Sequence, residues 1–178
     1  MNISAGIVFQ NISSVTNSYS TGSVSGRGST GGIVGSVGNG SSVTNCFAIG
    51  AISSSTGQSD IGGLVGQCHG SVENSAALNP SVISALNVNG GRRVTIRMQL
   101  IQPTLDNNVA WSGMTTVNGS TVSSTDGSSE NGEDITAAAI RADGTIGGRF
   151  TSAGGWTTQD GRLPGLFGET VALPAHLQ

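Results

Sequence analysis

The hydrophobic residues of this chain occur in short runs, which glycine, serine, threonine and asparagine separate. Segments 31–35 and 62–66 read Gly-Gly-Ile-Val-Gly and Gly-Gly-Leu-Val-Gly, and segment 5–9 is a degenerate copy of them. Glycine permits tight corners and close backbone approach, so each segment predicts a short apolar strand. The apolar residues do not follow the 3.6-residue period of a helix, and glycine and serine are poor residues inside one.

A second motif alternates with the first one. Residues 14–22 read Ser-Val-Thr-Asn-Ser-Tyr-Ser-Thr-Gly; they return as 42–50, more weakly as 71–79, and a fourth time in 105–113. The spacing of about 26 to 31 residues lies in the range of solenoid repeats. The sequence therefore predicts an all-β fold, a β-helix-like solenoid of about four coils. Coils stacked at about 4.8 Å would align their Val and Ile residues in interior ladders.

Several repeat positions are candidate binding rows. Asn17, Asn45, Asn74 and Asn108 share one motif position, and we interpret them as an amide ladder that satisfies backbone groups between coils. The alternative is a row of ligand-binding side chains.

Two further rows run beside the asparagines. Tyr19 and Phe47 share a position that Ala76 takes next, which favours stacking between coils over a sugar-binding platform. Thr16 and Thr44 are followed by Glu73, so the regular threonine row of an ice-binding face is broken.

The fourth coil departs from the pattern. Segment 90–95 reads Gly-Gly-Arg-Arg-Val-Thr, which puts Arg92 where the motif has an apolar residue. An unpaired arginine cannot face a dry interior without a large cost, so the register slips or this coil is distorted. Segment 94–100 alternates and predicts a strand with one solvated face. At the other end Phe9 replaces a glycine, which predicts an edge coil, and we expect further coils upstream.

The repeat ends near residue 114, which predicts two parts: solenoid repeats in 1–114 and a C-terminal cap in 115–178. The one helical candidate is 134–141, with Asp134 as N-cap and Arg141 at the negative end of the helix dipole. A solenoid needs a cap because an open coil invites edge pairing. We assign this role to the large apolar residues, a Trp-lined ligand groove being the alternative: Trp111, Trp156, Leu163, Leu166 and Phe167.

Composition excludes several classes of function. The chain has 29 glycines, 10% charged residues and a net charge of −3, and its only basic cluster is Arg92, Arg93 and Arg97. Nucleic-acid binding needs more clustered positive charge, so we expect no nucleic-acid partner. Its apolar runs are too short for a transmembrane helix, so no membrane insertion is expected. The residues after Met1 lack the features of a signal peptide.

Site chemistry is sparse. Cys46 and Cys68 lack metal-ligand spacing; a disulfide between them is open, but two buried thiols fit better. Glu130, Glu133 and Asp134 form the only acidic cluster, interpreted as a solvated loop, with weak Ca²⁺ binding as the alternative. We expect no catalytic residue, no metal and no cofactor.

The pairing of segment 62–66 with 43–50 resembles the GLUG motif of large bacterial surface proteins. These include adhesin-like and filamentous-haemagglutinin-like proteins and non-catalytic parts of some IgA peptidases. Segments 107–114 and 154–168 are similar to the last repeat and C-terminal tail of such arrays in gut Bacteroidetes. The resemblance covers about residues 5–114 and 145–175.

That resemblance implies a non-catalytic structural or adhesive module, secreted or on the cell surface, whose leader lies outside this sequence. Its partners would be surface proteins or glycans of host or bacterium, and upstream repeats of the same chain. The alternatives are a carbohydrate-active β-helix, such as a polysaccharide lyase or hydrolase, and an ice- or glycan-binding solenoid. An enzyme of that kind needs convergent carboxylates, whereas the ten acidic residues here are scattered.

Overall fold

The computed structural model describes residues 3–11, 13–55, 60–84, 94–97, 102–116 and 121–178. It is mostly β, with one short α-helix in the described part, as the sequence predicts. The chain divides into two compact units, 1–134 and 135–178. The first unit extends past the end of the sequence repeat because the following segment is hydrogen-bonded to the last repeat. Asn108 N donates to Gly127 O at 3.0 Å and Val94 N donates to Glu130 O at 3.0 Å.

The described strands, all in the first unit except for the last residue of β17, form four sheets. The first contains β1 (Ile3–Ala5), β5 (Ser29–Gly31) and β9 (Ile61–Gly62), and the second contains β2 (Val8–Asn11), β6 (Val34–Val37), β10 (Val65–Cys68) and β14 (Ile96–Arg97). The third contains β3 (Ser14–Ser20), β7 (Ser42–Ala48), β11 (Ser71–Glu73), β12 (Ala76–Ala77), β15 (Thr104–Asp106), β16 (Val109–Trp111) and β17 (Glu133–Ile135). The fourth contains β4 (Val24–Gly26), β8 (Ile52–Ser54) and β13 (Val82–Ser84).

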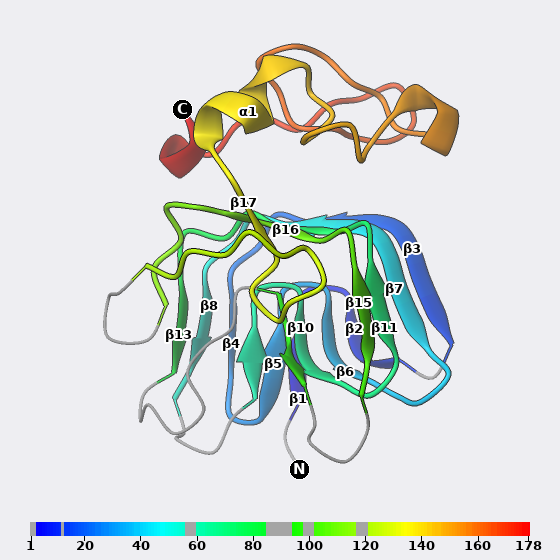
Figure 1. Cartoon of the computed structure of the whole chain (residues 1–178), viewed down its shortest axis with the longest axis vertical. Coiled ribbons are helices and arrows are strands. Elements are labelled where there is room, and N and C mark those ends of the chain that lie inside the picture. The colour runs from blue at the N-terminus through cyan, green and yellow to red at the C-terminus, as the bar shows by residue number, and fades with distance from the viewer. Residues whose placement is uncertain (1–2, 12, 56–59, 85–93, 98–101, 117–120) are drawn as a thin grey trace. The chain divides into compact units, whose positions relative to one another are not determined.

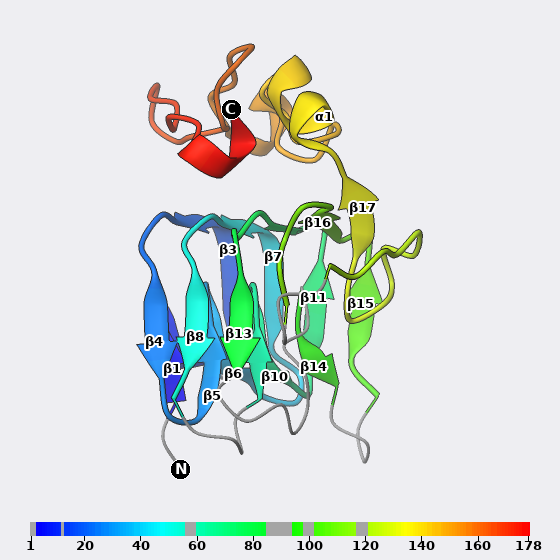
Figure 2. The same cartoon turned by 90° about the vertical axis from the view of Figure 1, so that its left-hand side faces the viewer.

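Consecutive repeats lie side by side as layers. We call β1–β4 layer 1, β5–β8 layer 2, β9–β13 layer 3 and β14–β16 layer 4. Equivalent strands of neighbouring layers pair in parallel, so β3, β7, β11 and β15 follow one another in one sheet (Figure 1). Strands β4, β8 and β13 run next to each other in the same way (Figure 2).

The register aligns like residues across the layers. Val15 pairs with Val43, Val43 with Val72, and Val72 with Leu105, and this row belongs to the apolar core. Because alternate residues of a strand face opposite sides, the neighbouring row of hydroxyls faces outward. This hydroxyl row consists of Ser14, Ser42, Ser71 and Thr104.

The paired glycines of the first motif allow the backbone to come close to neighbouring segments. A Cβ on Gly31 would lie 2.2 Å from Val34 O and 2.7 Å from both Gly66 N and Leu64 O. No side chain fits there without moving backbone of two layers, which is why the motif requires glycine.

The fourth layer keeps an apolar interior by shifting its register. Ile33 N and Val34 N both donate to Leu64 O, and Leu64 N and Val65 N both donate to Val94 O. Val94 therefore takes the motif place that Leu64 holds, two residues after the place where the sequence puts Arg92. Arg92 and Arg93 lie outside the described residues.

The strand predicted for 94–100 is only partly confirmed, because the described β14 covers Ile96–Arg97 and residues 98–100 lie outside the description. The solvated face is not found in the described part: Val94, Thr95 and Ile96 are all buried. Segment 121–134 covers this stretch, with Val94 N and Thr95 N both bonded to Glu130 O.

The second unit contains α1 (Ala137–Ala142) and two 3₁₀ turns, η2 (Ser152–Gly154) and η3 (Ala175–Leu177). The predicted N-cap was wrong. Asp134 belongs to β17, and Thr136 caps the helix by accepting a hydrogen bond from Ala139 N at 3.1 Å. Arg141 does lie in the last turn.

Of the large residues assigned to the cap, Trp156 and Leu163 are buried and Leu166 is half-buried. Trp156 meets Phe150 edge to face at 4.9 Å between ring centroids. Trp111 packs against the core of the first unit. Phe167 is 98% exposed at a left-handed φ of 58°, so it does not pack within the second unit. A capping role for the rest of 135–178 stays a prediction.

Candidate functional site

The asparagine row is a structural feature of a corner in the third sheet, which lies within β3 and β7 and separates β11 from β12 and β15 from β16. Asn17, Asn45, Asn74 and Asn107 all have left-handed φ angles, between 46° and 53°. Asparagine tolerates this conformation better than most residues. Asn107 Nδ2 donates to Asn74 Oδ1 at 2.7 Å, and Asn74 Nδ2 donates to Asn45 Oδ1. The predicted amide ladder is confirmed in part: Asn45, Asn74 and Asn107 form it, but their amides bond to one another and not to the backbone groups that the prediction names.

The fourth member of the row is Asn107, and the assignment of Asn108 was wrong. The pairing of Glu73 with Asp106 puts Asn107 opposite Asn74. Asn108 instead points inward and is fully buried. Its Oδ1 accepts from Ser75 N at 3.1 Å and its Nδ2 donates to Val72 O at 2.7 Å, so it satisfies backbone groups of the layer before.

The aromatic pair stacks between layers as predicted. The rings of Tyr19 and Phe47 lie 5.2 Å apart at 8° between planes, and the register continues through Ala76 to Val109. The threonine row runs through Thr16, Thr44, Glu73 and Asp106, so it ends after two layers, as the sequence predicts.

The structure brings together one group of polar residues that the sequence analysis did not single out. An open hollow of about 360 Å³ lies at the corners that lead from the second sheet into the third. We call it the polar hollow, and its lining residues are Asn39, Gly40, Ser41, Ser42, His69, Gly70, Ser71, Glu73, Gln102 and Thr104. The available signal was weak: these corner residues share a place in the repeat, but they have little in common as residue types.

A half-buried carboxyl lies close to this hollow. Asp60 Oδ2 accepts from Gln67 Nε2 at 3.0 Å, and Gln67 Oε1 accepts from Ser36 Oγ at 3.4 Å. Burial raises the pKa of Asp60, while the hydrogen bond from Gln67 and the charge of His69 oppose that rise. The network links layers 2 and 3 through side chains.

The acidic cluster of Glu130, Glu133 and Asp134 does not form a cation site in the described residues, where no group of three potential ligands converges. Asp134 Oδ2 accepts from Ser123 Oγ at 2.8 Å. The backbone of Glu130 and Glu133 joins segment 121–134 to the repeats. The alternative of weak Ca²⁺ binding therefore gains no support from this geometry.

Both cysteines are free and buried, which agrees with the interpretation of Cys46 and Cys68 as two buried thiols. Cys46 Sγ lies 3.3 Å from Thr44 O and 3.6 Å from Val15 O. Burial raises the pKa of its thiol to about 11. No described helix is long and apolar enough to cross a membrane.

Comparison with known proteins gives one structural match. No protein-family model matches the chain, and no curated protein matches it. A solved structure from Bacteroides ovatus, described as a "putative immunoglobulin A1 protease", is similar with a TM-score of 0.63 and 25% identity. The match covers 81% of this chain and 47% of that one, so the chain spans about half the length of its neighbour.

Proposed function

We propose that the chain is a structural and adhesive module of a secreted or cell-surface bacterial protein, built as a β-helical solenoid and without catalytic activity. The observation that carries this proposal is the strand-for-strand, parallel pairing of successive repeats. Such stacking makes a stiff body with extended side-chain rows, which suits a stalk or a binding face. The sequence resemblance to GLUG repeats supports the same assignment.

The hydroxyl row and the adjoining polar hollow are the best candidate for a binding face. Parallel pairing spaces the hydroxyls of Ser42, Ser71 and Thr104 by about 4.8 Å, and Glu73 and His69 lie at the same corner. Hydroxyl, amide and carboxylate groups in an open hollow match the hydrogen-bonding groups of a glycan or of a polar protein surface. We propose one of these as the partner.

The description of the structural neighbour favours a second candidate, a peptidase. The polar hollow does contain the residue types of a hydrolase, since His69 and Glu73 lie with serines. A nucleophile must lie within hydrogen-bond reach of its base. In the described part of the chain the imidazole of His69 makes no hydrogen bond, and the chain covers only 47% of the neighbour. These observations favour the non-catalytic assignment.

An immunoglobulin A1 cleavage assay separates the two candidates. The purified chain should leave immunoglobulin A1 intact after prolonged incubation. Cleavage that His69→Ala abolishes, while Ser25→Ala on the exposed part of β4 does not, would overturn the non-catalytic assignment.

A glycan array tests the adhesive part of the proposal. We expect retention of at least one glycan class, weakened by Glu73→Ala in the polar hollow and unchanged by Ser25→Ala. Retention that Glu73→Ala leaves unchanged would exclude the polar hollow as the binding face. Surface location is tested by protease treatment of intact cells of the source bacterium, which should release peptides of this chain.

A further inference from the structure

All four sheets end in the same layer. Strands β1, β2, β3 and β4 stand last in their sheets, and within the described residues each has a strand neighbour on one side only. A terminal parallel strand presents backbone donors and acceptors to whatever lies beyond it. We call the surface made by these four strands and their corners the open end.

Interior residues are exposed at the open end. Ile7 is 44% exposed, whereas Ile33 and Leu64, which hold the same place in layers 2 and 3, are fully buried. Val15 and Val24 are half-buried, while their partners Val43 and Ile52 are fully buried. These side chains belong to rows that continue through the core, so the open end is a cross-section of that core.

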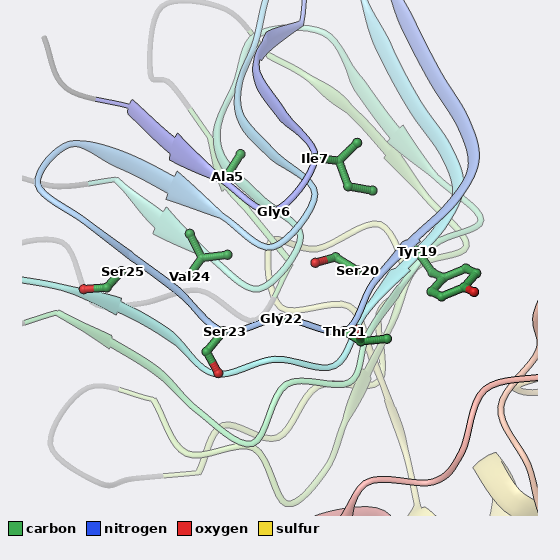
Figure 3. A pocket seen from close by; sticks show the side chains of 10 residues that line it. All are labelled: Ala5, Gly6, Ile7, Tyr19, Ser20, Thr21, Gly22, Ser23, Val24 and Ser25. Atoms are coloured by element: carbon green, nitrogen blue, oxygen red, sulfur yellow. The ribbon is translucent and has the colours of Figure 1, made fainter.

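A wide hollow marks the same surface. It measures about 720 Å³ and is lined by residues 5–7 and 19–25. Figure 3 shows Ser20 and Val24 pointing toward Gly6, inside the outline of the layer, whereas Tyr19 points away from it. In layers 2 and 3 the equivalent side is covered by the strands of the preceding layer.

Nothing in the composition of the open end opposes strand pairing. Residues 3–26 include no charged residue and no proline, the two devices that commonly protect an exposed edge. At the opposite end segment 121–134 covers layer 4 through Gly127 O and Glu130 O. Segment 121–134 therefore covers one end of the stack, whereas none of the segments that the structure describes covers the other.

We infer that the open end binds a further coil of the same repeat type, in parallel register. This inference rests on the proposed structural role. The arriving coil would place aliphatic residues opposite Ile7, Val15 and Val24, and an aromatic or small residue opposite Tyr19. The contact would repeat the one that layer 1 already makes with layer 2.

The test adds one coil to the chain. A copy of residues 3–28 is fused directly ahead of Ile3. In the native chain Gly28 precedes Ser29, the register partner of Ile3, so the fusion keeps the repeat in phase. The matched control carries V15D and V24D within the copy only, which removes its apolar rows and leaves the rest of the chain unchanged.

Hydrogen exchange gives the result. With the intact copy, amides of the original segment 13–26 should exchange at least tenfold more slowly, and the urea m-value should rise. The control should exchange like the unextended chain. A copy that stays sensitive to proteolysis, with 13–26 exchanging as before, would overturn the inference.

Two further measurements distinguish a further coil from a second copy of the chain as the occupant of the open end. A dimer of the unextended chain that the intact copy abolishes would show that a second copy, and not a further coil, occupies the open end, and would overturn the choice of occupant. Ile7→Ala should raise the equilibrium constant for unfolding in both chains, and the rise should be several-fold larger in the extended chain than in the unextended one. Neither result depends on immunoglobulin A1 or glycan assays, so failure here is distinguishable from failure of the proposed function.

Discussion

At the scale of single residues, the asparagine corner combines backbone strain with an amide ladder. Asn74 has a φ of 48° and is bonded to both Asn45 and Asn107. Asn74→Ala loses these bonds and forces an alanine into the left-handed region, which costs about 1–2 kcal/mol by itself. Asn74→Gly loses only the bonds. We expect the alanine variant to be the less stable one, by about 1 kcal/mol in urea unfolding.

The control for this pair is Asn39→Ala, at an exposed turn, which should change the free energy of unfolding by less than about 0.5 kcal/mol. Equal stability of Asn74→Ala and Asn74→Gly would show that the left-handed corner is not strained.

Cys46 gives a pH prediction. Its thiol has a pKa of about 11 in the folded chain, against an ordinary value of 9.0, because it is buried. The unfolded chain therefore ionises first as pH rises, and the stability linked to this group is full below about pH 9 and falls between pH 9 and 11. Cys46→Ala should flatten the fall in urea midpoint over this window.

Thiol chemistry checks the same residue independently. The folded chain should react with a thiol reagent at pH 8 far more slowly than the urea-unfolded chain, because the reactive thiolate is suppressed. An unchanged pH profile in Cys46→Ala, together with rapid modification of Cys46, would contradict the buried neutral thiol.

Sequence reasoning at this scale succeeds where a position repeats. The shared corner of Asn17, Asn45 and Asn74 and the stack of Tyr19 on Phe47 follow from alignment of the repeats alone. It fails at the Asn107-Asn108 pair, because two adjacent asparagines satisfy the same pattern and only the strand register separates corner from interior. The polar hollow could not be predicted either, since its residues are joined only by the meeting of corners.

At the scale of the element, the glycines of the two motifs differ in what surrounds them, as Gly31 of the first motif and Gly22 of the second show. Gly31→Ala would put a methyl group 2.2 Å from Val34 O and 2.7 Å from Gly66 N, so backbone must move in two layers. Gly22→Ala meets nothing within 4 Å. We expect Gly31→Ala to cost about 3 kcal/mol or more, and Gly22→Ala to stay within about 0.5 kcal/mol.

Thermal and urea unfolding, with far-ultraviolet circular dichroism as the signal, measure both variants. A Gly31→Ala chain as stable as Gly22→Ala would mean that the strands do not approach each other as closely as the glycine contacts require.

Elements are predictable where a local pattern decides them. The short strands of the repeats, and the absence of helix from their described residues, follow from apolar runs bounded by glycine. The helix in the second unit is also predicted, but its cap is not, because Thr136 and Asp134 are both good N-caps and strand pairing of 133–135 takes Asp134. The register shift that brings in Val94 depends on packing, which local sequence does not encode.

At the scale of the molecule, the stack is a row of similar layers in which each one is stabilised mainly by its neighbours. The first layer has such a neighbour on one side, and layers 2 and 3 have one on both sides. Stability should therefore be unequal along the stack, although the residues are alike. The pattern of repeats predicts the layers, but which of them is exposed becomes visible only once the strands are paired.

Val43 and Val15 test this inequality because they are the same residue in the same row, one layer apart. Val43 is fully buried in layer 2, and Val15 is half-buried in layer 1. Removing two methyl groups from a buried valine costs about 2 kcal/mol, so Val43→Ala should lower the free energy of unfolding by about that amount. Val15→Ala should cost less than about 1 kcal/mol, because part of its side chain already contacts water.

Urea unfolding of the two variants gives the difference directly. Equal losses would mean that Val15 is as well covered as Val43, which would contradict an open first layer. Val43→Ala should cost more than Val15→Ala in the unextended chain. If that difference disappears when a coil is added ahead of Ile3, it arises from position in the stack, since the residue and its row are unchanged.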